Sequence, residues 1–95
     1  MAVGIRMDFP GGTQEQYDRM MEQLNLGERM PPGGILHTSG WMPEGWLVVE
    51  VWESQEAFDT FFEERLSPVM RNVRLPLPRV YRTYDLYHSL GPAVP

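Results

Sequence analysis

The chain has 95 residues and contains no cysteine, which excludes disulfides, thiolate metal sites and cysteine nucleophiles. All eight of its basic residues are arginine, so lysine Schiff-base chemistry is excluded as well. This length predicts one domain over residues 1–95. A domain of this size buries only about 60–65 per cent of the surface of its unfolded chain, and burial against a partner would add stability.

The net charge of −5 is unevenly distributed along the chain. Residues 1–64 hold three arginines against twelve acidic residues, whereas residues 65–95 hold five arginines against Asp85 alone. The basic end either binds an anion or pairs with acidic surface of its own or a partner subunit, and the second interpretation is favoured. Because the chain is acidic and has no basic stripe or recognised motif, it is not expected to bind nucleic acid.

The first residues have no charged leader followed by an apolar run, and no apolar segment approaches the roughly 20 residues that span a bilayer. A cytoplasmic protein without membrane contact is therefore expected.

The first half of the chain predicts a strand, a helix and a second strand. Apolar and polar residues alternate over residues 2–9, and the pair Thr13 and Gln16 has the spacing of a capping box. A helix is predicted from residue 14 to about residue 25. Its apolar stripe, expected in the core, consists of Tyr17, Met20, Met21 and Leu24. A turn-rich connector precedes a strand over residues 35–41.

The second half begins with a tight turn over residues 43–45 and a central strand over residues 46–52. Ser54 is the expected N-cap of a second helix with an aromatic inner face. Ser67 and Pro68 predict that this helix breaks and starts again. A last strand is predicted from residue 79 to about residue 90, followed by a tail.

The predicted order βαββαβ indicates an α+β protein with the ferredoxin-like fold. This fold is a four-stranded antiparallel sheet with both helices on one face and the first and third strands in the middle. The strand over residues 46–52 has large apolar groups on both faces, so both faces of the sheet should be covered. Since the helices cover only one face, the other indicates a dimer or a ligand.

One assignment of the faces places Leu47, Val49 and Val51 toward the helices. The opposite face would then carry Trp46, Val48, Glu50 and Trp52, together with Arg6, Asp8, His37, Ser39, Trp41, Arg82, Tyr84 and His88. A slip of one residue in any strand would reverse its assignment.

Residues 48–58, VVEVWESQEAF, resemble the dimeric α+β barrel superfamily, in particular antibiotic-biosynthesis monooxygenase domains. The shared features are a strand that ends in Trp52, a cap at Ser54 and an alanine at the start of the helix. The resemblance implies a homodimer in which two sheets pack back to back, with a pocket in each subunit. It also covers haem-degrading enzymes, cyclases, muconolactone isomerases and proteins without a known reaction. Haem degraders use a histidine on the second helix, where this chain has phenylalanines instead, so neither haem nor another cofactor is expected.

Several side chains are candidates for chemistry, each with a structural alternative. His37 is the best general acid or base, but a buried histidine is equally often satisfied by a backbone carbonyl. Arg6 and Asp8 either orient a ligand or form a salt bridge at a dimer interface, which is the commoner case. Trp46, Trp52 and Tyr81 either stack on a planar substrate or belong to the core.

A metal site would need His37, His88 and one carboxylate from Asp8 or Glu50. None of these spacings is diagnostic, and no metal is expected.

The favoured hypothesis is a small homodimeric enzyme that oxygenates or cyclises a hydrophobic, polyketide-like substrate without a cofactor. His37 would move a proton, and Arg6 or Arg82 would stabilise an enolate or carboxylate. The expected substrate-binding residues are Asp8, Trp41, Trp46, Glu50, Trp52, Tyr84 and His88. The alternative hypothesis is a non-catalytic dimer that binds a small ligand or has a structural role.

Overall fold

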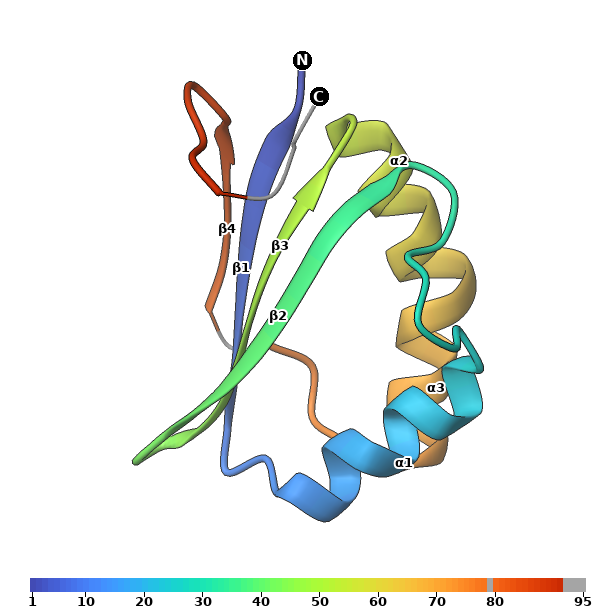
Figure 1. Ribbon diagram of the computed structural model, residues 1–95. Helices are drawn as coiled ribbons and strands as arrows, with labels where there is room; N and C mark the ends of the chain where they lie inside the picture. Colours follow the sequence, from blue (N-terminus) through green and yellow to red (C-terminus); the bar gives the residue numbers. More distant parts are fainter. Residues whose placement is uncertain (79, 92–95) are drawn as a thin grey trace.

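The computed structural model describes residues 1–78 and 80–91, without the side chains of Val80 and Tyr81. Its four strands form one antiparallel sheet in the order β2-β3-β1-β4, and the helices cover one face of it (Figure 1). The strands are β1 (Val3–Pro10), β2 (Gly34–Met42), β3 (Gly45–Trp52) and β4 (Val80–Asp85). The ferredoxin-like fold predicted from the sequence is confirmed, with β1 and β3 in the middle.

Helix α1 (Gln14–Leu24) begins and ends as its sequence predicts. The Thr13 side chain accepts from the backbone N–H of Gln16, whose side chain bonds back to Thr13. At the other end, Asn25 takes the left-handed conformation that often closes a helix. These caps satisfy backbone groups that the helix itself leaves unpaired.

The second helical segment is continuous, contrary to the predicted break at Ser67. It consists of α2 (Gln55–Phe61), one π-helical turn η1 (Phe62–Leu66) and α3 (Ser67–Asn72). Ser54 caps its start as predicted, by accepting from the N–H of Ala57. Ser67 does not cap a new helix, and its N–H instead donates to the carbonyl of Phe62. The wide turn relieves the clash that Pro68 would cause inside a regular α-helix.

Strand β4 ends at Asp85, before the predicted end near residue 90. Asp85 pairs with Val3, the first residue of β1, and the N–H of Leu86 then donates to the carbonyl of Ala2. The strand ends there because β1 begins at Val3, so the regular pairing between the two strands stops at this point. The predicted first residue of this strand, at position 79, and the end of the predicted tail, residues 92–95, lie outside the described residues.

The predicted orientation of β3 is wrong. Val48 and Trp52 are fully buried against the helices, where Trp52 packs on Phe58 and Phe61. The pairing of β1 with β3 decides the orientation, because the apolar alternate residues of β1 point to the helices and lie opposite the even-numbered residues of β3. The face away from the helices therefore carries Leu47, Val49 and Val51.

Within the described residues, none of the helices has the length and apolar character needed to cross a membrane.

Gly45, at the start of β3, provides a test of the hairpin geometry. Its φ of +144° is rarely adopted by other residues, and an added Cβ would lie 2.3 Å from the carbonyl oxygen of Phe9. We expect Gly45→Ala to lower the free energy of unfolding by about 2 kcal/mol or more, measured by urea denaturation. Gly40→Ala in β2 is the matched control, because its Cβ would meet only Leu47 at 4.0 Å. Equal stabilities of the two variants would contradict this account.

Candidate functional site

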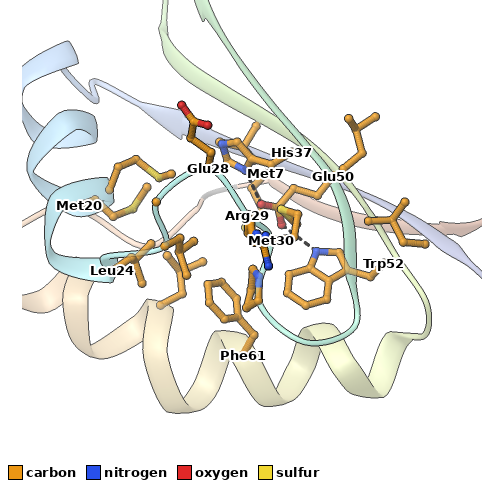
Figure 2. Close-up of a pocket in the computed structure, with 18 of the residues that line it drawn as sticks. Met7, Met20, Leu24, Glu28, Arg29, Met30, His37, Glu50, Trp52 and Phe61 are labelled. Carbon is orange, nitrogen blue, oxygen red and sulfur yellow. Dashed lines mark hydrogen bonds and ion pairs between the residues drawn. The ribbon is translucent and has the colours of Figure 1, made fainter. Parts of the chain in front are cut away.

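A cavity of about 320 Å³ lies between the sheet and the helices (Figure 2). Strands β1, β2 and β3 form its floor, and α1, the middle of the second helical segment and the connector between α1 and β2 form its walls. Most lining residues are apolar: Met7, Phe9, Met20, Met21, Leu24, Leu26, Met30, Pro31, Ile35, Leu36, Val48, Trp52, Phe61 and Leu66. The cavity is large enough and apolar enough to hold a small hydrophobic molecule.

The sheet contributes two polar residues to the lining of this cavity, His37 of β2 and Glu50 of β3. They lie directly opposite each other on adjacent strands, and His37 Nδ1 is 2.5 Å from Glu50 Oε2. The other oxygen of Glu50 accepts from Trp52 Nε1 at 2.9 Å, as the dashed lines in Figure 2 mark. Glu50 is the one buried charged side chain among the described residues, with 5% of its surface exposed.

The hydroxyl of Tyr17, on α1, is 2.6 Å from His37 Nε2 and completes a chain of three polar groups. The donors follow from chemistry. With Glu50 ionised and the His37 ring neutral, Nδ1 donates to Glu50, and Nε2 accepts from the Tyr17 hydroxyl. This order places an unprotonated imidazole nitrogen beside a phenol, with a carboxylate behind it. It is the arrangement by which acid–base enzymes orient and strengthen a histidine base.

Burial raises the pKa of the Tyr17 phenol above its ordinary value of 10.0. A hydrogen bond from Ser39 acts in the opposite direction, while the negative charges of Glu50 and Asp18 raise the pKa further. The ring of Tyr17 also stacks on Trp46, with centroids 4.9 Å apart. Tyr17 is therefore held as a neutral donor to His37.

Several predicted site residues come together on the helix-covered face. His37, Glu50 and Trp52 line the cavity, as expected of substrate-binding or catalytic groups. Trp41 and Trp46 are on the same face, in edge-to-face contact at 5.0 Å, but they do not line the cavity. Trp41 is 62% exposed.

Arg6 and Asp8 lie on the opposite face of the sheet. Arg6 Nε donates to Asp8 Oδ1 at 2.8 Å, so the two residues form an ion pair with each other and not with Glu50. The pairing with Asp8 raises the pKa of the Arg6 guanidinium. The prediction that they share a face with His37 and Glu50 is wrong, because β1 turns its apolar residues to the helices.

The predicted site residues of the last strand also lie away from the cavity. Arg82 and Tyr84 are exposed and belong, by strand register, to the face that carries Arg6. The Tyr84 ring lies over Gly4, where an added Cβ would fall 2.1 Å from Tyr84 Cζ. His88 is exposed beyond the end of β4. Throughout residues 1–78 and 80–91, no three histidine or acidic side chains gather to hold a metal ion.

Three polar residues of the site, Tyr17, Glu28 and Arg29, were not among the predicted ones. Tyr17 was assigned to the apolar stripe of α1, and its hydroxyl is the signal that distinguishes it from the neighbouring methionines. Arg29 lies in the connector and lines the cavity. No local pattern marks it, because its position depends on how the connector folds over the sheet.

No protein-family model and no curated protein sequence match this chain. Solved structures do match it. They include a Chloroflexus aurantiacus protein classed with the antibiotic biosynthesis monooxygenases, with 16% identity over 96% of this chain and 98% of the other and a TM-score of 0.68. SnoaB, a cofactor-independent oxygenase from Streptomyces nogalater, is 15% identical over 94% of this chain and 95% of its own, with a TM-score of 0.62.

A dimeric ferredoxin-like protein of unknown function from Thermobifida fusca is 12% identical over 90% of each chain, with a TM-score of 0.59. At these identities the comparisons establish a common fold. The resemblance seen at residues 48–58 is thereby confirmed at the level of the fold: the chain has the ferredoxin-like architecture of antibiotic biosynthesis monooxygenase-like proteins.

The raised pKa of Tyr17 predicts how stability depends on alkaline pH. A group that holds its proton more tightly when folded stabilises the fold fully below its unfolded pKa, and loses that contribution as the pH rises through the folded value. We therefore expect the free energy of unfolding to fall above pH 10, and to fall less in Tyr17→Phe, measured by urea denaturation at a series of pH values. Tyr87→Phe, at a fully exposed tyrosine, is the control and should behave as the wild type. Parallel curves for Tyr17→Phe and the wild type would contradict the prediction.

Proposed function

We propose that this protein is a homodimeric enzyme that oxygenates or cyclises a planar, hydrophobic, polyketide-like substrate without a cofactor. The observation that carries the proposal is the chain Glu50–His37–Tyr17, of which Glu50 and His37 line a largely apolar cavity. The common fold with a cofactor-independent oxygenase supports the reaction class. Fold alone does not choose a reaction, so the argument rests on the site.

In this proposal His37 moves the proton that starts the reaction. A substrate that takes the place of the Tyr17 hydroxyl at Nε2 transfers a proton to His37, and Glu50 stabilises the imidazolium that forms. The N–H of Trp52 keeps Glu50 oriented. The methionines and aromatic rings of the wall exclude water, so the resulting carbanion is not reprotonated before it reacts.

Oxygenation then needs only molecular oxygen as co-reactant. The carbanion formed at a CH₂ group supplies an electron pair to O₂, a C–O bond forms, and the proton held by His37 completes a hydroperoxide. Loss of water from the hydroperoxide leaves a ketone, so that one oxygen atom enters the product and the other leaves as water. The substrate is oxidised and O₂ is reduced, and no other electron donor takes part. Cyclisation would use the same proton transfer without consuming O₂.

The homodimer is supported by the sheet face that no helix covers. This outer face is defined by Gly4, Arg6, Asp8, Thr38, Leu47, Val49, Val51, Arg82 and Tyr84. Tyr84 of β4 is 51% exposed, and Val49 and Val51 form an apolar strip on β3. A second copy of the chain would cover this strip, and the matched fold of a dimeric protein supports the same arrangement.

A second candidate function is ligand binding without turnover. It is favoured by one observation: both ring nitrogens of His37 already have protein partners, as in a structural histidine. In that case the cavity holds a small apolar molecule and the polar chain serves only to join α1 to the sheet.

Replacement of His37 tests the catalytic role. Anthrone is a suitable probe, because its CH₂ group is acidic and its reaction with O₂ yields anthraquinone and water. We expect His37→Ala to lower the rate of O₂ consumption by about 100-fold or more while the variant still binds anthrone. Thr38→Ala, next to it on the outer face, is the control and should keep the wild-type rate. Unchanged turnover in His37→Ala would remove His37 from this role, and a wild type that binds planar C–H acids but turns none over would favour the second candidate.

The dimer has its own test in native mass spectrometry. The wild type should give a mass of two chains, and Val49→Glu should give a monomer, since it buries an unpaired charge in the interface. Thr60→Glu, on the exposed side of α2, should remain a dimer. A monomeric wild type would refute the homodimer.

A further inference from the structure

Among the described residues that line the cavity, Arg29 is the only arginine. It lies in the connector between α1 and β2, where its backbone N–H donates to the carbonyl of Leu26. Within the described part of the chain, its side chain has no hydrogen-bond or ion-pair partner. A guanidinium at an apolar cavity is thus available to a ligand.

Three of the other described arginines have acceptors within the protein. Arg6 pairs with Asp8, Arg65 donates to the carbonyl of Leu24, and Arg71 donates to Ser67. Arg29 differs from them in having a cavity beside it instead of a protein acceptor.

The other charges in the cavity wall define where an anion would lie. Glu50 accepts hydrogen bonds from His37 and Trp52, and its carboxylate disfavours a second anion at that end of the cavity. Glu28 and Arg29 both line the cavity from the connector, and both are exposed. In Figure 2 the carboxylate of Glu28 points away from the other drawn side chains. An anionic group would therefore be favoured at Arg29 and disfavoured at Glu50.

We infer that the ligand of this cavity is a planar apolar molecule with a carboxylate, and that Arg29 binds this carboxylate. The planar fork of a guanidinium matches the two oxygens of a carboxylate, and the methionines of the wall adapt to a flat ring system. The inference rests on the proposed function in taking the cavity as the substrate site. It adds an orientation: the carboxylate lies toward the connector, and the carbon that loses a proton lies toward His37.

The experiment compares two probes of the same shape, anthracene-2-carboxylate and the neutral anthracene-2-carboxamide. Their binding to the full-length protein is followed by ligand fluorescence. We expect the wild type to bind the acid about five- to tenfold more tightly than the amide, as for a well-aligned ion pair at a partly exposed site. Arg29→Gln should bring this ratio close to one by weakening binding of the acid. High salt should reduce the ratio in the wild type.

Glu28→Gln is the matched control, because it alters the adjacent connector residue and should keep the preference for the acid or increase it. An equal preference in the wild type and Arg29→Gln would overturn the inference, and so would a wild type that binds neither probe up to the solubility limit. Turnover is measured separately with anthrone. A loss of acid preference in Arg29→Gln together with an inactive wild type would leave this inference standing and remove the proposed reaction. Turnover that depends on His37, with no preference for the acid, would support the proposed reaction and remove this inference.

Discussion

The carboxylate of Glu50 is the group on which the site depends. A charge in a sheet that is covered by helices is costly unless every nearby donor is directed at it. Here Trp52 satisfies one oxygen from the same strand, and His37 satisfies the other from the neighbouring strand. The second bond also fixes which nitrogen of His37 carries the proton, and thereby turns the other nitrogen toward Tyr17. One buried charge thus orders groups from β3, β2 and α1.

Local signals in the sequence predicted the elements and their order well. The caps at Thr13 and Ser54 depend on contacts over three residues, which a sequence displays directly. Which residues of β3 face the helices was harder to predict, because β3 carries apolar residues on both of its sides. The site required still more, because His37 and Glu50 meet only in one strand register, and Tyr17 reaches them from a separate helix. Such contacts are set by tertiary structure, and no spacing in the chain encodes them.

The two faces of the sheet carry different structural features. The helix-covered face carries the cavity and the polar chain, whereas the outer face carries the apolar strip and the ion pair of Arg6 with Asp8. Arg6 and Arg82, which were predicted to act beside His37, lie on the opposite face of the sheet from it. The proposed dimer contact and the proposed reaction would thus use opposite faces of the sheet.

The π-helical turn η1 has a consequence for the phase of the second helical segment. Buried residues of this segment occur at Phe58, Phe61, Leu66, Met70 and Val73, so one interval is five residues instead of three or four. A regular α-helix would rotate Leu66 out of the core, and the extra residue in the wide turn brings it back. The same rotation directs Arg65 to the carbonyl of Leu24, at the end of α1. One inserted residue therefore keeps Leu66 in the core and links the second helical segment to α1 beside the cavity.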